Sequence, residues 1–168
     1  MGQKLTKGDV AKIEEEIRMR RVELRPQLTA AVAEAAAQGD RSENYEYTAA
    51  KRENNQNNSR IRYLENVLRT AEIVDEVPAN PEEVNVDMDV TVYLPDEEEE
   101  EVYTLVTPIR ANTLQNVISI ESPMGKALLH HRVGDTVTVQ VNRNYAYTCT
   151  IRAIRPSDLA RQARISSY

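Results

Sequence analysis

The chain has 168 residues, of which 29% are charged and 40% hydrophobic, and it carries a formal net charge of −6. This length suits one domain or two small ones, and the absence of Trp and Phe argues against a large aromatic-lined pocket for a small molecule. Cys149 is the only cysteine, which excludes an internal disulfide and a cysteine-based zinc site. No apolar run approaches the roughly 18 residues that span a membrane, and the first residues lack the apolar stretch of a signal peptide, so we expect a cytoplasmic protein.

The charge is divided unevenly along the chain. Residues 1–75 hold 13 basic and 13 acidic side chains, whereas residues 76–168 hold 8 and 14. Neither half is the basic surface with which proteins neutralise nucleic-acid phosphates. If nucleic acid is involved, we therefore expect another protein to hold it.

The beginning of the chain predicts a long helix. Thr6 is placed to cap its start, and Pro26 lies inside it. Because proline lacks an amide hydrogen, Pro26 predicts a kink near Val22. The helix carries a coiled-coil seam, with positions alternating four and three apart, whose members are Ile17, Arg21, Leu24, Leu28, Ala31 and Ala35.

A second seam of matching length follows a bend at residues 38–44. Its members are Tyr47, Ala50, Asn54, Asn57, Ile61, Leu64, Leu68 and Ala71. Folding the chain at the bend brings the two seams together, so residues 1–76 predict an antiparallel coiled-coil hairpin about 45 Å long with its tip at 38–44. Asn54 and Asn57 place amides in the seam, where they either leave it partly wet or fix its register.

The helical period stops near residue 76, and Pro78 and Pro81 mark a linker. Residues 77–155 predict a small α+β domain with an antiparallel sheet and one short helix over 122–132, capped by Ser122. The expected strands are 86–94, 101–107, 116–122, 134–141 and 145–154. The acidic run at 96–101 predicts a solvated loop or, alternatively, a weak cation site or a segment that repels nucleic acid. Residues 156–168 predict a polar tail, either with one or two helical turns or disordered.

The sequence offers few residues for chemistry of its own. His130 and His131 are adjacent and have no ligand-spaced carboxylate beside them, so we expect a surface or helix-capping role. Cys149 lies in a predicted strand and is expected to be a small core residue. No Ser/His/Asp set and no Gly-rich phosphate loop is present. A self-contained enzyme is therefore not predicted.

Two acids at the predicted tip, Asp40 and Glu43, are three residues apart. Glu43 alone would stabilise the start of the second helix through the helix dipole. Exposed carboxylates at the end of a thin rod could instead reach into another molecule and complete the oxygen shell of a Mg²⁺ ion, which usually keeps several waters and few protein ligands. Both interpretations are open from spacing alone.

At this point the chain resembles the bacterial Gre transcript-cleavage factors, in blocks that cover nearly the whole chain. These are VELRPQL (22–28), GDRSENYEY (39–47), RIRYLENVLRTAEIVD (60–75) and ISIESPMGKALLHHRVGD (118–135). The tip is most similar to the GreB version. The resemblance implies a coiled-coil hairpin followed by a domain similar to the FKBP-type prolyl isomerases, without that activity.

The resemblance also implies a function. The hairpin would enter the secondary channel of RNA polymerase, where Asp40 and Glu43 would help hold a Mg²⁺ ion of the polymerase and orient the water that cleaves backtracked RNA. The protein would be a cofactor of the polymerase and not an enzyme. The expected partners are RNA polymerase and the nascent RNA 3′ end. We expect a monomer, no membrane partner and no tight Mg²⁺ site in the free protein.

Further residues follow from the same resemblance. Candidates to support the acids are Ser42, Asn44 and Glu46. Candidates to contact RNA are Arg41, Lys51 and Arg52, for which a solvated helix face is an equal alternative. Candidates for polymerase docking are Ser122, Pro123 and Met124. Two other functions stay open: a secondary-channel regulator that acts without cleavage, and a coiled-coil adaptor whose tip acids are only helix caps.

Overall fold

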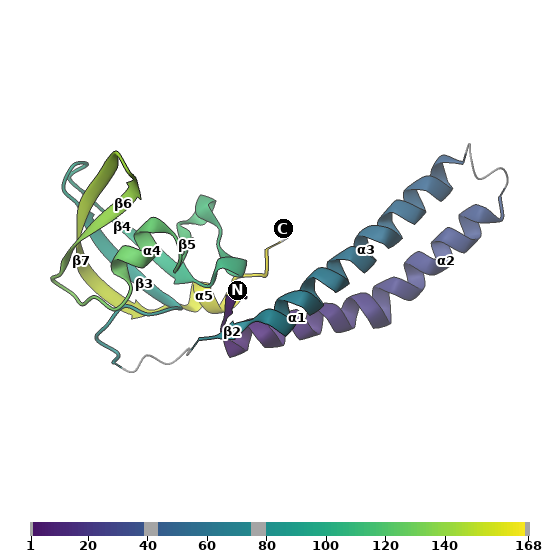
Figure 1. Ribbon diagram of the computed structural model, residues 1–168, viewed down its shortest axis with the longest axis horizontal. Coiled ribbons are helices and arrows are strands. Elements are labelled where there is room, and N and C mark those ends of the chain that lie inside the picture. Colours follow the sequence, from purple (N-terminus) through teal and green to yellow (C-terminus); the bar gives the residue numbers. More distant parts are fainter. Residues whose placement is uncertain (1, 39–43, 75–79, 167–168) are drawn as a thin grey trace. The chain divides into compact units, whose positions relative to one another are not determined.

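The computed structural model describes residues 2–38, 44–74 and 80–166 (Figure 1). The chain forms two compact units. The hairpin unit consists of Met1–Gly2 and Val10–Ala71, and the sheet unit consists of Gln3–Asp9 and Glu72–Tyr168. The segment Gln3–Asp9, which precedes the hairpin in the sequence, thus belongs to the sheet unit.

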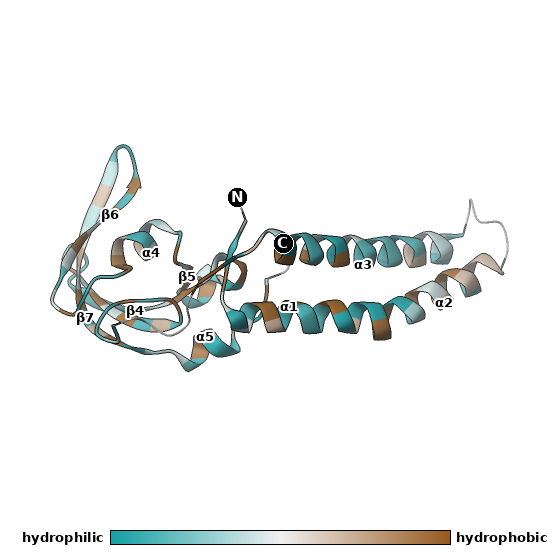
Figure 2. Ribbon diagram, turned by 60° about the horizontal axis from the view of Figure 1, so that its bottom comes forward, coloured by the Kyte–Doolittle hydropathy of each residue, from teal (hydrophilic) through white to brown (hydrophobic). Residues whose placement is uncertain are grey.

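The predicted helical hairpin is confirmed. Its elements are α1 (Lys7–Met19), a π-helical turn η1 (Arg20–Leu24), α2 (Arg25–Ala36) and α3 (Tyr45–Thr70). At 1.5 Å per residue, the 26 residues of α3 extend about 39 Å. Buried side chains mark the seam at Ile13, Ile17, Ala35, Asn57, Ile61 and Leu64. Hydrophobic bands alternate with hydrophilic ones along α1 and α3 (Figure 2).

The first helix is irregular where the sequence predicts a kink. The Arg25 amide donates to the Arg20 carbonyl, five residues back, and Pro26 follows in the first turn of α2. A π turn adds one residue to the helical repeat, so the seam shifts by one position. Arg20 is 25% exposed and Arg21 is 49% exposed. The sequence-based seam is therefore wrong at Arg21 and also at Ala31, which is exposed.

The sheet unit contains a five-stranded sheet with the order β5-β4-β3-β7-β6. The strands are β3 (Met88–Leu94), β4 (Glu99–Val106), β5 (Val117–Ser119), β6 (Thr136–Asn142) and β7 (Tyr145–Pro156). The sheet is mixed and not purely antiparallel as predicted, because β5 pairs with β4 in parallel. A separate parallel pair joins β1 (Lys4–Leu5) to β2 (Glu72–Ile73).

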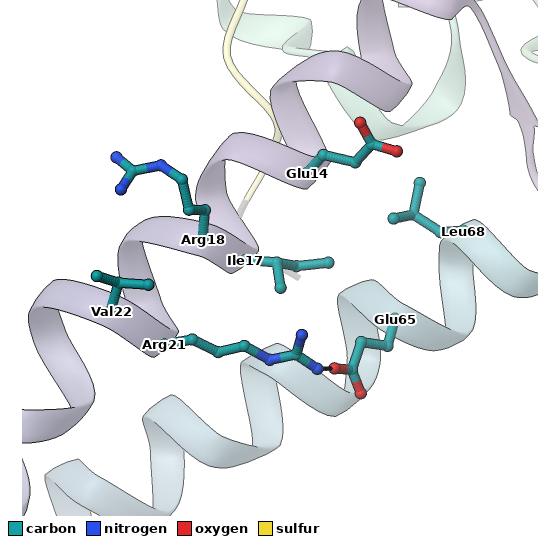
Figure 3. A pocket seen from close by; sticks show the side chains of 7 residues that line it. All are labelled: Glu14, Ile17, Arg18, Arg21, Val22, Glu65 and Leu68. Atoms are coloured by element: carbon teal, nitrogen blue, oxygen red, sulfur yellow. Dashed lines mark ion pairs between the residues drawn. The ribbon is translucent and has the colours of Figure 1, made fainter.

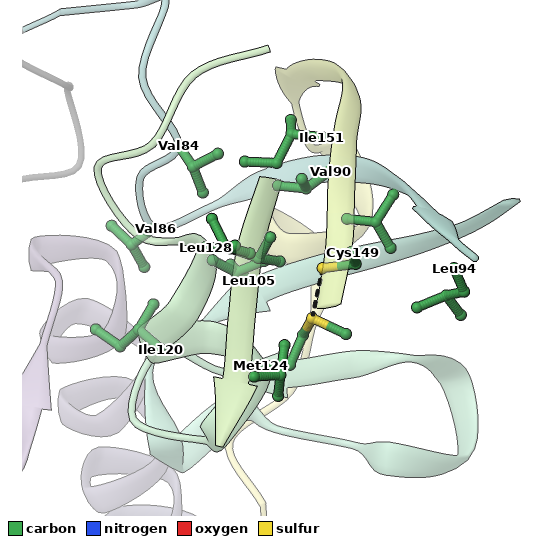
Figure 4. Packing of buried hydrophobic residues seen from close by; sticks show 13 residues of the cluster. Val84, Val86, Val90, Leu94, Leu105, Ile120, Met124, Leu128, Cys149 and Ile151 are labelled. Carbon is green, nitrogen blue, oxygen red and sulfur yellow. Dashed lines mark hydrogen bonds between the residues drawn. The ribbon is translucent and has the colours of Figure 1, made fainter. Parts of the chain in front are cut away.

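The apolar core of this unit lies between the sheet and α4 (Pro123–Leu128), as Figure 4 shows. Alternation along β3 buries Val90, Val92 and Leu94 on one face. Cys149 is buried, with its sulfur 4.0 Å from that of Met124, which confirms it as a core residue.

The end of the chain forms a short helix, which is one of the two alternatives that the sequence leaves open for the polar tail. A second short helix, α5 (Asp158–Gln162), buries Ala160 in a small cluster with Val106 and Val117. Two short 3₁₀ turns, η2 (Pro108–Arg110) and η3 (Thr113–Gln115), lie between β4 and β5.

Candidate functional site

Asn44 joins the two helix ends that flank the tip of the hairpin. Its Oδ1 accepts from the Tyr47 amide at 3.1 Å, which caps α3. Its Nδ2 donates to the Ala35 carbonyl at 2.8 Å, which satisfies a carbonyl in the last turn of α2. One side chain therefore fastens the end of α2 to the start of α3. The sequence suggested Asn44 only as a support for the tip acids.

The tip itself, with Asp40, Arg41, Ser42 and Glu43, lies outside the described residues. The metal and RNA roles predicted for these residues, and the likeness of the tip to GreB, therefore stay predictions. The described residues establish what comes immediately before and after them: α2 runs to Ala36 and α3 begins at Tyr45, and Asn44 bonds to both.

The first turns of α3 present three of the predicted site residues to solvent: Glu46, Lys51 and Arg52. Glu46 lies in the first turn, where a negative charge favours the helix dipole. The Lys51 ammonium is 6.0 Å from the centre of the Tyr47 ring. Sequence reasoning missed Tyr45, which is 91% exposed. An aromatic residue at the start of a helix and outside its seam is the signal that would have identified it.

A polar network lies in the middle of the hairpin seam. Glu16 Oε2 accepts from Arg20 Nε at 2.9 Å and from Arg60 Nε at 2.8 Å. Arg20 also donates to Asn57 Oδ1 at 3.0 Å, and Asn57 Nδ2 donates to the Arg20 carbonyl at 3.3 Å. The amide of Asn57 is therefore paired across the hairpin, and it meets Arg20, which the π turn has moved into the seam.

The same network sets the ionisation of Glu16. Partial burial on its own would raise the pKa of this carboxyl, but the hydrogen bonds and positive charges of Arg60 and Arg20 outweigh burial and hold the pKa below its usual value. Glu16 therefore favours its charged form in the folded hairpin.

A shallow groove lies on the hairpin beside this network, with a volume of about 490 Å³. Figure 3 shows the Arg21–Glu65 ion pair crossing from one helix to the other at the groove. The lining residues are Glu14, Ile17, Arg18, Arg21, Val22, Glu65 and Leu68. Three of its four charged side chains form ion pairs within the hairpin, Arg21 with Glu65 and Arg18 with Glu15.

A buried ionic cluster lies in the sheet unit and was not predicted. The Arg110 guanidinium is 2.5 Å from Asp9 Oδ1 and 2.7 Å from Asp87 Oδ1, and it donates to the Ala160 carbonyl at 2.7 Å. Thr107 donates to Asp9 Oδ2 at 2.5 Å. Arg110 therefore links segments that are far apart in the sequence, including α5.

Asp9 also completes the predicted cap of α1. Its carboxylate accepts from the Thr6 amide at 2.9 Å, and its amide donates to Thr6 Oγ1 at 3.1 Å. This reciprocal pair is a capping box with Asp in place of the usual Glu. The Asp9 side chain is 0% exposed, so one carboxylate both caps a helix and neutralises Arg110.

The three docking candidates have different surroundings. Ser122 accepts from the Gly125 amide at 3.1 Å and so caps α4, as predicted. Met124 is 6% exposed and belongs to the core, whereas Pro123 is exposed. Gly125 permits a close approach of α4 to β5, because a Cβ there would lie 2.1 Å from the Ser119 carbonyl oxygen. Docking at this segment stays a prediction, and its exposed member is Pro123.

The acidic run is partly a strand and not only a loop, since Glu99 and Glu101 lie in β4. Carboxylate oxygens of Glu97, Glu99 and Glu101 lie within 4.8 Å of one another. A hydrogen bond that the protonated Glu97 carboxyl donates to Glu99, slight desolvation and the neighbouring negative charges raise the pKa of Glu97. Tyr103 donates to Glu101 at 2.5 Å.

Both units match models of known protein families. The family model described as "Transcription elongation factor, N-terminal" matches residues 3–73, and the model described as "Transcription elongation factor, GreA/GreB, C-term" matches residues 78–156.

No helix within the described ranges is long and apolar enough to cross a membrane.

Individual relatives agree with the family models. Transcription elongation factor GreA of Rhizobium etli is 38% identical over 135 residues, covering 80% of this chain and 85% of the relative. GreA of Brucella anthropi is 39% identical over 135 residues, with 80% and 86% covered. A crystal structure of GreA factor homolog 1 of Thermus thermophilus is 30% identical, covers 92% of this chain and 99% of its own, and has a TM-score of 0.43. The chain belongs to the GreA/GreB family of transcription elongation factors.

Proposed function

We propose that this protein enters the secondary channel of RNA polymerase and stimulates the polymerase's intrinsic, Mg²⁺-dependent cleavage of backtracked RNA, so that an arrested complex resumes elongation. The single observation that carries the proposal is the match of two elongation-factor family models across both units. The protein would work in the bacterial cytoplasm, where the polymerase is, as a cofactor and not as an enzyme.

The hairpin suits this role because it is thin and closed at its end. Two antiparallel helices make a rod roughly 20 Å wide, since each helix with its side chains is about 10–12 Å across. The two hydrogen bonds of Asn44 hold the ends of α2 and α3 together, so the residues between the two helices start and finish at one fixed place. Groups on those residues can then be presented without spreading the helices.

Asp40 and Glu43 are the residues proposed to act in cleavage. Carboxylate oxygens are ligands that Mg²⁺ accepts in small numbers, and in two-metal sites the bound ions activate the attacking water and stabilise the leaving oxygen. The two acids would lend oxygens to an ion that the polymerase holds and would orient the water. Arg41, Lys51 and Arg52 would contact the extruded RNA. The sheet unit would dock on the polymerase, with Pro123 among the contacts.

The test uses halted, backtracked elongation complexes whose RNA carries a label near its 3′ end. The native chain is expected to release short 3′ fragments, and Asp40→Asn or Glu43→Gln is expected to lose most of this cleavage while still binding polymerase. Glu53→Gln, which neutralises an exposed acid of α3, is the matched control and should cleave normally. Full cleavage by the doubly substituted tip would overturn the proposal.

Two outcomes would favour the other functions. Polymerase binding without cleavage by the native chain would identify a secondary-channel regulator. No polymerase binding would leave a coiled-coil adaptor, in which Glu43 and Asp40 serve only the helix ends. Tight Mg²⁺ binding to the free chain in calorimetry would contradict the borrowed-metal mechanism.

A further inference from the structure

Tyr45 is an aromatic side chain that the fold of the hairpin does not use. It is the first residue of α3 and is 91% exposed, so its ring packs on nothing in the described chain. A tyrosine covers about 150–250 Å² when it is buried. A ring of this size, held on a rigid helix beside the hairpin tip, is placed to contact a partner.

The residues around Tyr45 form a polar face with a single positive charge. At 3.6 residues per turn, Ala49, Arg52 and Gln56 lie within about 40° of Tyr45 around the helix, and all are exposed. The partly buried seam residue Asn54 lies on the opposite side. We call Tyr45, Ala49, Arg52 and Gln56 the Tyr45 face.

The acids of this region lie off the face. Glu46 and Glu53 are about 80–100° away from Tyr45 at the same helical repeat. No ion pair or hydrogen bond of the Arg52 side chain is found among the described residues. Its guanidinium is therefore available to an anion, and none of the described residues places a carboxylate on the Tyr45 face to repel that anion.

We propose that the Tyr45 face binds single-stranded RNA, with one base stacked on the Tyr45 ring and a backbone phosphate held by Arg52. This inference rests on the proposed function, which brings an unpaired RNA 3′ segment to the hairpin tip. Tyr45 and Arg52 are seven residues apart, or about 10.5 Å along the helix, so they would contact neighbouring nucleotides. Tyr45 would be a binding residue, separate from the tip acids.

RNA fits this face better than a protein does. Single-stranded RNA is recognised by stacking of its unpaired bases on aromatic side chains, and such stacking tolerates any base because each has a π face. That tolerance suits a factor that meets a different RNA sequence at each arrest. A stable protein interface needs about 800 Å² on each partner, more than one strip of one helix supplies.

The experiment measures binding apart from cleavage. Halted complexes carry 4-thiouridine at the RNA 3′ end, either backtracked or not, and each variant is built on the Asp40→Asn, Glu43→Gln background so that the RNA stays intact. Tyr45→Ala is expected to weaken binding to backtracked complexes and the crosslink to RNA by about tenfold. Tyr45→Phe, which keeps the ring, should retain both. Tyr145→Ala, which removes a 55% exposed tyrosine from the sheet unit, is the matched control.

Salt dependence separates the two contacts. Arg52→Gln is expected to reduce the slope of log K against log salt by about 0.7, the value for one phosphate contact to a single strand, whereas Tyr45→Ala should leave the slope unchanged. Because stacking carries no net charge, this difference distinguishes the ring from the guanidinium.

The outcomes decide the inference independently of cleavage. Equal crosslinking and affinity of Tyr45→Ala and the parent would overturn it, even if the native chain cleaves RNA and the proposed function stands. An equal loss of affinity for backtracked and non-backtracked complexes would also overturn it, because the ring would then contact the polymerase itself. If the native chain fails to cleave, the proposed function fails. The ratio of the affinities for backtracked and non-backtracked complexes still decides the role of Tyr45.

Discussion

The two units bury polar groups in different ways. In the hairpin unit, Arg60 and Asn57 lie within the seam itself. Arg60 bonds to Glu16, which is 21% exposed, and Asn57 bonds to Arg20. In the sheet unit, 13 residues form an apolar cluster, and the charges of Arg110 and Asp9 lie apart from that cluster, 2% and 0% exposed. Two helices enclose only a narrow interior, whereas a sheet covered by helices encloses a wider one in which apolar residues can cluster apart from charges.

This difference has an energetic consequence. A partly exposed ion pair stays close to water and contributes little, because solvent screens it. A buried ion pair contributes little compared with an apolar substitute, but removing one partner leaves an uncompensated charge in the interior. The sheet unit should therefore be far more sensitive to single changes in its ionic cluster than the hairpin is to changes in its seam.

Arg110→Met should show the largest effect. It leaves Asp9 buried without its cation and removes the donor to the Ala160 carbonyl. We expect the sheet unit to lose about 3–5 kcal/mol of stability, measured by urea unfolding with tyrosine fluorescence, and α5 to lose protection in hydrogen exchange.

An exposed arginine of the same sheet provides the control. Arg155 is 75% exposed and lies 3.4 Å from Asp89, so Arg155→Met should cost less than about 1 kcal/mol. Similar losses of stability for Arg110→Met and Arg155→Met would show that burial does not govern how much the Arg110 cluster contributes to stability.

Paired leucine substitutions compare the two interiors directly. Leu128 in the sheet unit and Leu64 in the hairpin are both 0% exposed. Leu128→Ala should cost about 3–4 kcal/mol and Leu64→Ala about 2 kcal/mol, within the usual range for buried leucines, because two helices can close over a small cavity more easily than a sheet and its covering helix. The helical signal at 222 nm and tyrosine fluorescence follow the two units. A larger loss of stability for Leu64→Ala than for Leu128→Ala would contradict this comparison of the two interiors.

The sequence predicted the elements better than the contacts between them. Local signals gave the helices, most strands and the caps at Thr6 and Ser122, because hydrophobic period and cap chemistry depend on residues close in sequence. The parallel pairing of β5 was missed, since pairing direction depends on a connection through 3₁₀ turns that carries no period. The shift from Arg21 to Arg20 was missed because Pro26 was expected to bend the helix and not to add a residue to a turn.

The candidate site was predicted from the resemblance to the Gre family more than from the spacing and chemistry of its residues. Nothing in spacing alone favoured metal binding by Asp40 and Glu43 over helix capping. The cap and cross-link made by Asn44 could have been anticipated from its place before α3, but its bond to Ala35 depends on the folded hairpin. The cluster around Arg110 joins residues about 100 positions apart in the sequence, a distance over which no local pattern operates.

Asn44→Ala tests whether the hairpin end is held by one side chain. Loss of the cap should cost about 1 kcal/mol, and the amides of Tyr47 and Thr48 should exchange faster with solvent. RNA cleavage should fall without loss of polymerase binding, because the ends of α2 and α3 are no longer fastened to each other. Asn44→Asp keeps the cap acceptor but removes the donor to Ala35, so recovery of helix protection without recovery of cleavage would show that the cross-link has its own role.

The smallest expected effect concerns pH and the hairpin seam. Because the Arg60 and Arg20 contacts hold the pKa of Glu16 below its usual value, this carboxylate stabilises the folded hairpin above the unfolded-state pKa of about 4.3. The contribution is lost as the pH falls through the folded pKa. Glu16→Gln should therefore cost about 1 kcal/mol at pH 7, and the difference from wild type should shrink below pH 4. Glu15→Gln changes an exposed acid that pairs with Arg18 and is the neighbouring control. Thermal unfolding followed at 222 nm from pH 3 to 7 measures the stability of both variants. If Glu16→Gln is still as destabilised at pH 3 as at pH 7, the packing around the side chain, and not its charge, stabilises the seam.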